Sequence, residues 1–379
     1  MKTDAMPSLV VEGGFRERGN AVGEAMRDRI AACLDSIDRA GEKERGIAAK
    51  TFQADFLRET KFLPAIESHT PDLLEEVRGL AEGANQPFER MLYAQLMDEE
   101  WVYVRNKKYA MAADAGHCSG FAVRQDDNTI VAQNMDLGQW LDGHQAVVRH
   151  IDRDAGFDIQ VLTFAGYLGL CGMNRNGPAV CCNTLLDLDS NPAGLPVAFI
   201  FRSLVQSTSV ADAAKRAREF RHASGQNYVI GGRDGVLSLE CSAHEVAGFH
   251  PPGAVGRVYH TNHAHANKDT SYVDRHVPNG TIAERCRSPS SPARLQSVAE
   301  RIGNDRKIDV AYAMETLRAK DDPAAPVCRD GNNARDDAQI GFTFGSIVCE
   351  ISAAPAMHVA PGPPCHTSYK RFDFQQVSR

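Results

Sequence analysis

The 379-residue sequence lacks three features that would each indicate a particular class of protein. No apolar run is long enough to cross a bilayer, and Met1–Ala5 lacks the apolar core of a signal peptide. Basic residues are not in excess, since the net charge is -7, which argues against a nucleic-acid or anionic-membrane surface. The ten cysteines include no Cys-x-x-Cys pair, so neither a zinc ribbon nor a thioredoxin motif is indicated. We therefore expect a reduced, cytoplasmic protein without nucleic-acid or membrane partners.

What the sequence does contain is enough apolar material for a real core, since hydrophobic residues make up 43% of the chain. Residues 8–110 are expected to be mostly helical. Apolar residues recur every three or four positions over 19–37, which is a helical face. Thr70, Pro71 and the acids after them predict a helix start at residue 70, and Gly83 predicts its end. A further helix is predicted over 88–104.

The pattern changes after residue 110, where short alternating or apolar runs bounded by glycine and Asp-Gly turns predict strands. These runs are 119–124, 129–134, 145–151, 158–164, 178–184, 227–231, 235–241, 256–261, 341–352 and 356–360. Helices are predicted between them at 197–206, 210–221 and 289–302. Helices that come first, followed by many strands with a helical layer between them, fit a layered α+β domain better than an alternating βαβ fold.

One predicted hairpin brings two chemically useful groups together. The runs 119–124 and 129–134 flank an Asp/Asn turn, which predicts two antiparallel strands. Cys118 stands where the first strand begins, and Asp136 follows the end of the second. Because paired strands lie about 5 Å apart, the thiol and the carboxylate are expected to share one site. The simpler interpretation is that Cys118 is a small buried hydrophobic residue and Asp136 caps a turn.

Six motifs in order make the chain resemble the cysteine N-terminal-nucleophile hydrolases. The closest resemblance is to the self-cleaving acyl-CoA:6-aminopenicillanic acid acyltransferase family, with bile-salt and penicillin V hydrolases more distant. The motifs are the helix Pro71–Gly83, the strand Cys118–Val123, the return strand Ala132–Asp136, Gly172–Gly177 followed by Asn183, His260–His263 and Ser290–Arg294. The resemblance implies a four-layer αββα sandwich that needs no cofactor.

The resemblance also implies a role for each candidate residue. Cys118 would be the nucleophile, and Asp136 would hold its freed α-amine in place. Asn262 and Asn183 would donate hydrogen bonds to the oxyanion, and Arg294 would favour the ionised thiol. Without the resemblance, the two asparagines are strand-end side chains that bond the backbone, and Arg294 is a solvated first-turn arginine.

In this family the precursor cuts itself before the nucleophile, here at the His117–Cys118 bond. The cut would divide the chain into a helical segment, 1–117, and an αββα catalytic segment, 118–379. A free α-amine can then serve as the base, so no separate histidine is needed. The expected substrate is a small N-acyl amide or acyl thioester, with hydrolysis favoured over acyl transfer. We also expect Phe164–Leu168 to line an acyl pocket or to be ordinary core. Oligomeric state is left open.

Two other readings belong to different classes. His260, His263 and His265 lie close together in the sequence, and such histidines can bind zinc in a metal-dependent hydrolase. The nearest carboxylate, Asp269, lies in a stretch that reads as a turn. A non-enzymatic binding protein is the second alternative, and it predicts that replacing Cys118 leaves function unchanged.

Overall fold

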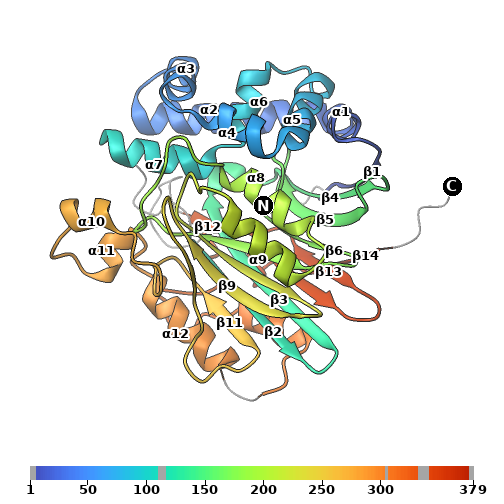
Figure 1. Cartoon of the computed structure of the whole chain (residues 1–379), viewed down its shortest axis with the longest axis vertical. Helices are drawn as coiled ribbons and strands as arrows, with labels where there is room; N and C mark the ends of the chain where they lie inside the picture. Colours follow the sequence, from blue (N-terminus) through green and yellow to red (C-terminus); the bar gives the residue numbers. More distant parts are fainter. Residues whose placement is uncertain (1–5, 110–116, 304–305, 332–340, 375–379) are drawn as a thin grey trace.

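The computed structural model describes residues 6–109, 117–303, 306–331 and 341–374, and helices precede most of the strands, as the sequence predicts (Figure 1). The predicted helix at residue 70 is confirmed, because α5 begins at Pro71 and ends at Gly83. The other elements of this first part are β1 (Ser8–Glu12), α1 (Phe15–Ala25), α2 (Arg27–Arg45), α3 (Ala49–Glu59), α4 (Phe62–His69), α6 (Phe88–Ala94) and α7 (Met97–Lys107).

Two predicted helices are each divided in the structure. The apolar face over 19–37 belongs to α1 and α2, which meet at Met26, a residue with non-helical backbone angles. The predicted helix over 88–104 is divided at Gln95–Leu96 into α6 and α7. In each case the two successive helices bury apolar residues at the same spacing, so the apolar periodicity continues across the break. The pattern alone therefore could not locate either break.

The strands form two sheets, and every predicted strand run is confirmed. The first sheet has the order β1-β4-β5-β6-β7-β8-β9-β10, and the second has the order β11-β2-β3-β12-β13-β14. The strands are β2 (His117–Gln125), β3 (Asn128–Gly138), β4 (Gln145–Asp152), β5 (Phe157–Phe164), β6 (Cys171–Asn174), β7 (Ala179–Thr184), β8 (Gln226–Gly232), β9 (Gly235–Cys241), β10 (Val246–Gly248), β11 (Arg257–His260), β12 (Gly341–Ile351), β13 (Ala356–Ala360) and β14 (Lys370–Asp373).

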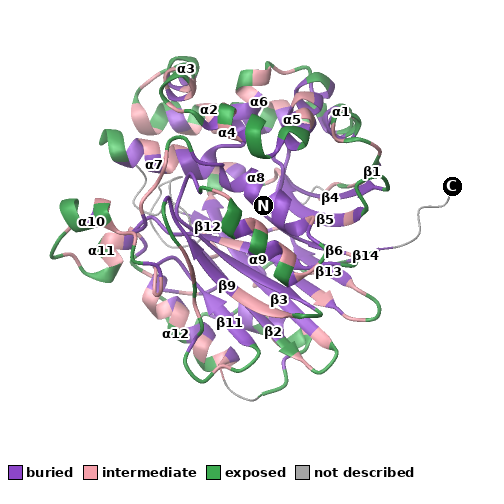
Figure 2. Cartoon of the chain, in the orientation of Figure 1, coloured by how far each residue is buried: buried purple, intermediate pink, exposed green. Residues whose placement is uncertain are grey.

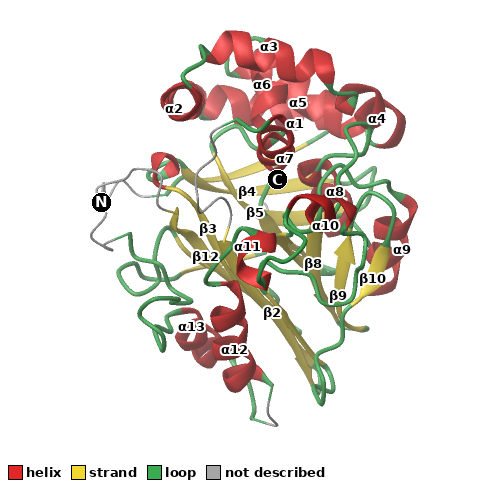
Figure 3. Cartoon of the chain, turned by 90° about the vertical axis from the view of Figure 1, so that its left-hand side faces the viewer, coloured by secondary structure: helices red, strands yellow, loops and turns green. Residues whose placement is uncertain are grey.

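The two sheets pack face to face, with β2 against β7 and β8, and helices cover both outer faces (Figure 3). The helices α8 (Val197–Val205) and α9 (Val210–Glu219) cover the eight-stranded sheet. The helices α12 (Ser291–Ile302) and α13 (Val310–Leu317) cover the six-stranded sheet. The four-layer αββα architecture is therefore confirmed. The shorter elements η1 (Gln139–Leu141), α10 (Ser271–His276) and α11 (Ile282–Cys286) lie in the connections.

Alternation along β2 decides which side chains face which layer. Cys118 and Ala122 belong to the core between the sheets, whereas Phe121 and Val123 pack in a second core beneath α12 and α13. Both faces of the strand are thus buried, as Figure 2 shows for the central strands as a group. A strand that is buried on both faces has a nearly continuous apolar sequence. On the face between the two sheets, small residues such as Ala122 allow close packing.

The first part of the chain contributes more than the predicted helices. Its strand β1 pairs in parallel with β4 and forms one edge of the eight-stranded sheet. Sequence analysis missed β1 because its partner lies well over a hundred residues away. No helix among the described residues is both long and apolar enough to cross a membrane.

A buried ionic cluster joins this first part to the rest of the molecule. Glu76 of α5 accepts two hydrogen bonds from Arg202 of α8, at 2.8 and 3.0 Å. Arg18 of α1 lies 3.5 Å from the same carboxylate and bonds Asp152 at the end of β4 at 2.6 Å. The side chains of both arginines are fully buried. The charges balance within the cluster, which makes such deep burial tolerable.

Candidate active site

The predicted hairpin that carries Cys118 is confirmed. Along β2 and β3, His117 lies opposite Asp136 and Cys118 lies opposite Met135. The turn that joins the strands includes Asp126, whose φ of 53° is tolerated better by Asp and Asn than by most residues. Cys118 is therefore the second residue of a central strand, and its main chain is fixed by ladder hydrogen bonds on one side.

In the uncut chain the Cys118 thiol is buried, with 7% of the residue exposed. Burial is the main cause that raises its pKa well above the ordinary value, and the negative charge of Asp136 adds to the effect. The backbone N–H of Asp136 and the guanidinium of Arg294 act in the opposite direction. The protonated thiol is consequently the dominant form before any cut is made.

Asn262 contacts the backbone nitrogen that would become the α-amine. Its Oδ1 accepts a hydrogen bond from Cys118 N–H at 2.7 Å, and its Nδ2 donates to the carbonyl of Thr184 at 3.0 Å. The resemblance assigned the contact with this nitrogen to Asp136 and assigned oxyanion donation to Asn262. In the structure Asn262, and not Asp136, contacts the Cys118 nitrogen. One of the two amide hydrogens of Asn262 is bonded to the Thr184 carbonyl, so only the other could serve an oxyanion.

Asp136 follows Met135, the residue opposite Cys118 on β3. Its Oδ1 accepts a hydrogen bond from Thr343 Oγ1 of β12 at 2.7 Å. Thr343 is held in turn by Arg329, whose backbone N–H donates to Thr343 Oγ1 at 3.0 Å. The predicted proximity of Asp136 to Cys118 is present, since its backbone N–H and its charge both act on the thiol. Thr343 and Arg329 had no signal in the sequence, because they approach from strand β12 and the loop before it.

Arg294 is fully buried, so the interpretation as a solvated first-turn residue is wrong. Its Nη1 donates to the carbonyl of Cys118 at 2.6 Å and to Ser119 Oγ at 2.9 Å, and its Nη2 donates to Asn262 Oδ1 at 2.9 Å. Burial lowers its pKa to about 10, so the guanidinium stays charged at neutral pH. It is a positive group held at the residue that carries the thiol.

His117, the residue before the predicted cut, is also fixed. Its ring is fully buried, and Nδ1 lies 2.6 Å from Ser288 Oγ. Arg294 Nη2 lies 3.4 Å from the same ring nitrogen. The peptide bond between His117 and Cys118 is thus held from both sides by buried polar groups.

Asn183 is the candidate with an unused hydrogen-bond donor. It lies on β7, and its Oδ1 accepts from Asn227 at 3.4 Å, while its buried Nδ2 has no hydrogen-bond partner among the described residues. A Cβ placed on Gly120 would lie 3.5 Å from Asn183 Oδ1, so Asn183 packs against the strand that carries Cys118. A buried amide without a partner is costly, which suggests that it serves a bound group.

The loop that carries Asn262 is organised by Glu240, a residue that sequence analysis missed. Backbone N–H groups of His265, Ala266 and Asn267 donate to its carboxylate at 2.7–2.8 Å, and His260 Nε2 lies 2.8 Å from Oε1. Burial alone would raise the pKa of Glu240, but these hydrogen bonds lower it to about 2. Glu240 precedes the loop by twenty residues or more, and nothing in its local pattern indicates the contact.

The histidine cluster is not arranged as a metal site. Both ring nitrogens of His260 are engaged, by Glu240 and by the carbonyl of Thr261. His263 Nδ1 bonds Ser291 Oγ at 2.7 Å, and the ring of His265 stacks on Phe249 with centroids 4.4 Å apart. The carboxylate considered for this site, Asp269, bonds Ser242 and His244 instead. The geometry therefore argues against the metal-dependent hydrolase.

A cavity of about 360 Å³ lies between the N-terminal helices and the end of β3. Aromatic and apolar side chains of Trp101, Trp140, Phe164 and Met97 line it, with basic residues Arg39 and Lys43 on α2. Phe164 thus lines a cavity, as one alternative for the segment 164–168 expected. Ala165, Tyr167 and Leu168 are core residues, as the other alternative expected.

The chain is similar to several known proteins. The chain is 25% identical over 275 residues to the 40 kDa form of acyl-coenzyme A:6-aminopenicillanic-acid acyltransferase from Emericella nidulans, covering 70% of this chain and 71% of that protein. Among solved structures it is similar to a mutant of conjugated bile acid hydrolase from Clostridium perfringens, with 12% identity, a TM-score of 0.42, and coverage of 69% and 99%. Penicillin V acylase from Agrobacterium tumefaciens is also similar, with 12% identity, a TM-score of 0.41, and coverage of 69% and 87%.

The family match covers more than half of the chain. It extends over residues 123–339, and so includes Asp136, Asn183, Asn262 and Arg294, while Cys118 lies just before it. The motifs that carried the resemblance in the sequence thus lie on the strands and loops described above. The chain belongs to the acyl-coenzyme A:6-aminopenicillanic acid acyl-transferase family.

Proposed function

We propose that this protein is a self-processing amide hydrolase or acyltransferase and that Cys118 is its nucleophile. The observation that carries the proposal is the convergence of Asn262 and Arg294 on residue 118. They reach its backbone nitrogen and its carbonyl oxygen from two separate elements, at 2.7 and 2.6 Å. Buried backbone groups need hydrogen-bond partners in any strand, but here both partners are side chains and one of them carries a positive charge.

The first reaction is the cut before residue 118. Cys118 Sγ attacks the carbonyl carbon of His117, the C–N bond breaks, and the nitrogen takes up a proton. Water then hydrolyses the resulting thioester. The products are a carboxylate on His117 and a free amine and thiol on Cys118, so one water molecule is consumed. The buried contacts of the His117 ring with Ser288 and Arg294 fix the residue whose carbonyl reacts.

The second reaction uses the new amine. The Cys118 amine accepts the thiol proton, and the thiolate attacks the carbonyl carbon of the substrate. The tetrahedral oxyanion needs a donor, which the unpartnered Nδ2 of Asn183 supplies. The substrate amine leaves with the proton, and water or a second amine releases the acyl group from sulfur. Asn262 Oδ1, which accepts from the Cys118 nitrogen before the cut, orients the amine after it.

The N-terminal segment, residues 1–117, stays bound after the cut under this proposal. Its buried Glu76 is paired with Arg202 of the catalytic segment. Asp98 of α7 accepts from Thr184 Oγ1 at 2.5 Å, and the Thr184 carbonyl in turn accepts from Asn262. The helical segment therefore supports the site directly, and losing it would disturb Asn262.

The substrate proposed is a small N-acyl amide, with an acyl thioester as the alternative donor. The cavity lined by Trp140 and Phe164 lies beyond Gly138, two residues after Asp136. Its aromatic walls suit the apolar body of an acyl group, while its charged lining contains both basic and acidic residues. The acyltransferase from Emericella nidulans, whose name specifies an acyl-coenzyme A substrate, supports testing thioesters beside amides.

Intact mass and N-terminal sequencing test the proposal. Wild-type protein of 41.4 kDa should yield pieces of roughly 13 and 29 kDa, the larger beginning at Cys118. Cys118→Ala should remain intact, and the matched control Cys33→Ala, a buried cysteine in α2, should still be cut. A panel of amides and acyl thioesters then identifies the substrate. If the wild-type chain stayed intact, and if it and Cys118→Ala bound a ligand equally well, the result would instead favour a non-enzymatic binding protein.

A further inference from the structure

Two cysteines outside the candidate active site lie close enough to react with each other. Cys328 Sγ lies 2.9 Å from Cys365 Sγ, although the two residues are 37 positions apart. Cys328 is fully buried, whereas Cys365 is partly exposed. A disulfide bond is about 2.05 Å long, so the sulfur atoms need to approach by roughly 0.9 Å. β12 and β13 lie between them in the sequence.

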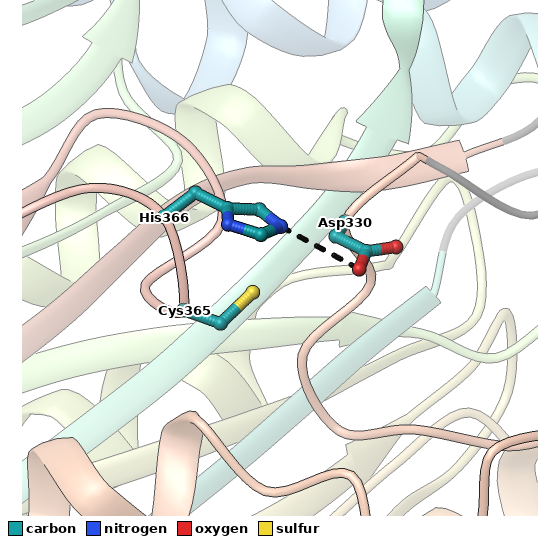
Figure 4. A group of neighbouring side chains, drawn as sticks. All are labelled: Asp330, Cys365 and His366. Carbon is teal, nitrogen blue, oxygen red and sulfur yellow. Dashed lines mark ion pairs between the residues drawn. The ribbon is translucent and has the colours of Figure 1, made fainter.

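Charged groups surround the more exposed sulfur. Lys320 Nζ lies 2.6 Å from Asp330 Oδ2, and His366 Nε2 lies 3.5 Å from the same oxygen. Figure 4 shows the His366 ring, Asp330 and the Cys365 sulfur grouped at one place. Hydrogen bonding to Asp330, followed by smaller contributions that include contact with Cys365, raises the pKa of Lys320. The Lys320 ammonium group therefore contacts both the Asp330 carboxylate and the Cys365 sulfur. The thiolate is the form of a cysteine that attacks disulfides.

We infer that Cys328 and Cys365 form a reversible redox pair. The Cys365 thiolate attacks a small oxidised thiol such as glutathione disulfide, giving a mixed disulfide and one glutathione thiolate. The Cys328 thiol, after losing its proton to that thiolate, attacks the Cys365 sulfur and releases the second glutathione. The protein loses two protons and two electrons, and the glutathione disulfide gains them to give two glutathione thiols. Burial is the main cause that raises the pKa of Cys328, so this thiol stays protonated until the released glutathione thiolate takes its proton, and the backbone N–H of Cys365 acts in the opposite direction to burial.

A metal site is the competing use of the same residues. Ligand atoms of Asp330, Cys365 and His366 all lie within 4.8 Å of one another. However, the Lys320 ammonium already occupies Asp330 Oδ2, and a divalent cation would have to displace it. The short distance between the two sulfurs and this bound cationic side chain both favour redox chemistry over metal binding.

The redox pair is connected to Asp136 through a short chain of contacts. Cys328 precedes Arg329, whose backbone exchanges hydrogen bonds with Thr343, at 3.0 Å to Oγ1 and at 2.9 Å from the Thr343 N–H. Thr343 Oγ1 donates to Asp136 at 2.7 Å. A disulfide at Cys328 would therefore fix the segment that supports Asp136. The inference itself does not depend on the proposed function, because its test reads covalent state and not activity.

Mass spectrometry of the purified chain tests the inference. Incubation with glutathione disulfide should give a protein lighter by two hydrogens, with one crosslinked peptide pair that contains Cys328 and Cys365, and a reductant should reverse it. In Cys328→Ser the mixed disulfide with glutathione should accumulate on Cys365. Lys320→Gln should slow the reaction several-fold, whereas Lys215→Gln, an exposed lysine on α9, should not.

Two results would overturn the inference. One is a wild-type chain that accumulates glutathione on Cys365 without forming the crosslink. The other is a purified wild-type chain with one equivalent of zinc that is lost in Cys365→Ser, which would assign the cluster to a metal.

Discussion

Two buried arginines of this protein are held in opposite ways. Arg202 lies in the cluster that joins the N-terminal segment to the sheet, where the carboxylate of Glu76 neutralises it through two hydrogen bonds. Arg294 lies at residue 118, where it donates to carbonyl, hydroxyl and amide oxygens and lies 3.4 Å from a ring nitrogen of His117. Among the described residues it forms no ion pair with a carboxylate. The positive charge of Arg202 is balanced by a carboxylate, whereas the positive charge of Arg294 has no carboxylate partner among the described residues.

The difference separates a structural from a chemical use of the same side chain. A balanced buried pair fixes the relative position of two elements, and removing one partner leaves the other charge uncompensated. A buried cation surrounded by neutral groups costs stability, and the lowering of its pKa to about 10 reflects this cost. Such a charge is useful where negative charge develops during a reaction, as it would on the thiol of Cys118.

The largest effect is expected when the balanced pair is broken. Glu76→Gln leaves Arg202 and Arg18 facing a neutral amide, which should lower the free energy of unfolding by about 3–5 kcal/mol. Glu75→Gln, next to it in the sequence but in an exposed pair with Arg16, should cost less than about 1 kcal/mol. Urea unfolding of both variants, each in the Cys118→Ala background, measures the two effects. Equal losses would show that the buried cluster does not hold the structure together.

The next effect should fall on chemistry and leave the fold intact. Asn183→Ala removes the unpartnered Nδ2, so turnover of an amide substrate should fall by about 10²–10³-fold. The substitution also removes the oxygen that accepts from Asn227 at 3.4 Å, so urea unfolding should show a loss of about 1–3 kcal/mol that is measured separately from turnover. Asn191→Ala, on an exposed turn, is the control and should retain full turnover. A normal rate in Asn183→Ala would remove this residue from the proposed oxyanion site.

Arg294→Met should sharpen the comparison through the pH profile. Loss of the positive charge makes the thiol harder to ionise, so the rise of activity with pH should shift to higher pH by about one unit. Arg294→Lys keeps the charge and should restore most of the original profile. Identical shifts in both variants would mean that Arg294 acts only through packing.

The last prediction concerns how the free energy of unfolding changes at acid pH through His150, which lies beside Glu76 in the buried cluster. Burial, with the charge of Arg202 as a further cause, lowers the pKa of His150 to about 3, and Glu76 acts in the opposite direction. The unfolded chain binds a proton below its ordinary pKa of 6.5 and the folded chain does not, so this residue lowers stability as pH falls. Between pH 7 and 5 the wild type should lose roughly 2 kcal/mol more than His150→Gln. Parallel unfolding curves for the two proteins would contradict this.

Local features were predictable from the sequence, and long-range contacts were not. The hairpin at Cys118 and the start of α5 follow from turn and capping residues, and both are confirmed. The parallel pairing of β1 and the carboxylate of Glu240 beneath the Asn262 loop join residues without any shared local pattern. The motif likeness indicated Asn262 as a candidate, but its contact with the Cys118 nitrogen depends on how two separate elements meet.

One crossing of helices sets the position of Glu76. In α1 and α5, Gly19 and Gly79 lie so close that a Cβ on either would stand about 2 Å from a backbone carbonyl of the other helix. Gly23 and Gly83 repeat the arrangement one turn further along. The two backbones therefore lie against each other without intervening side chains. A single added methyl group here would force the helices apart and move a carboxylate away from its arginines, although neither the acid nor the bases had been changed.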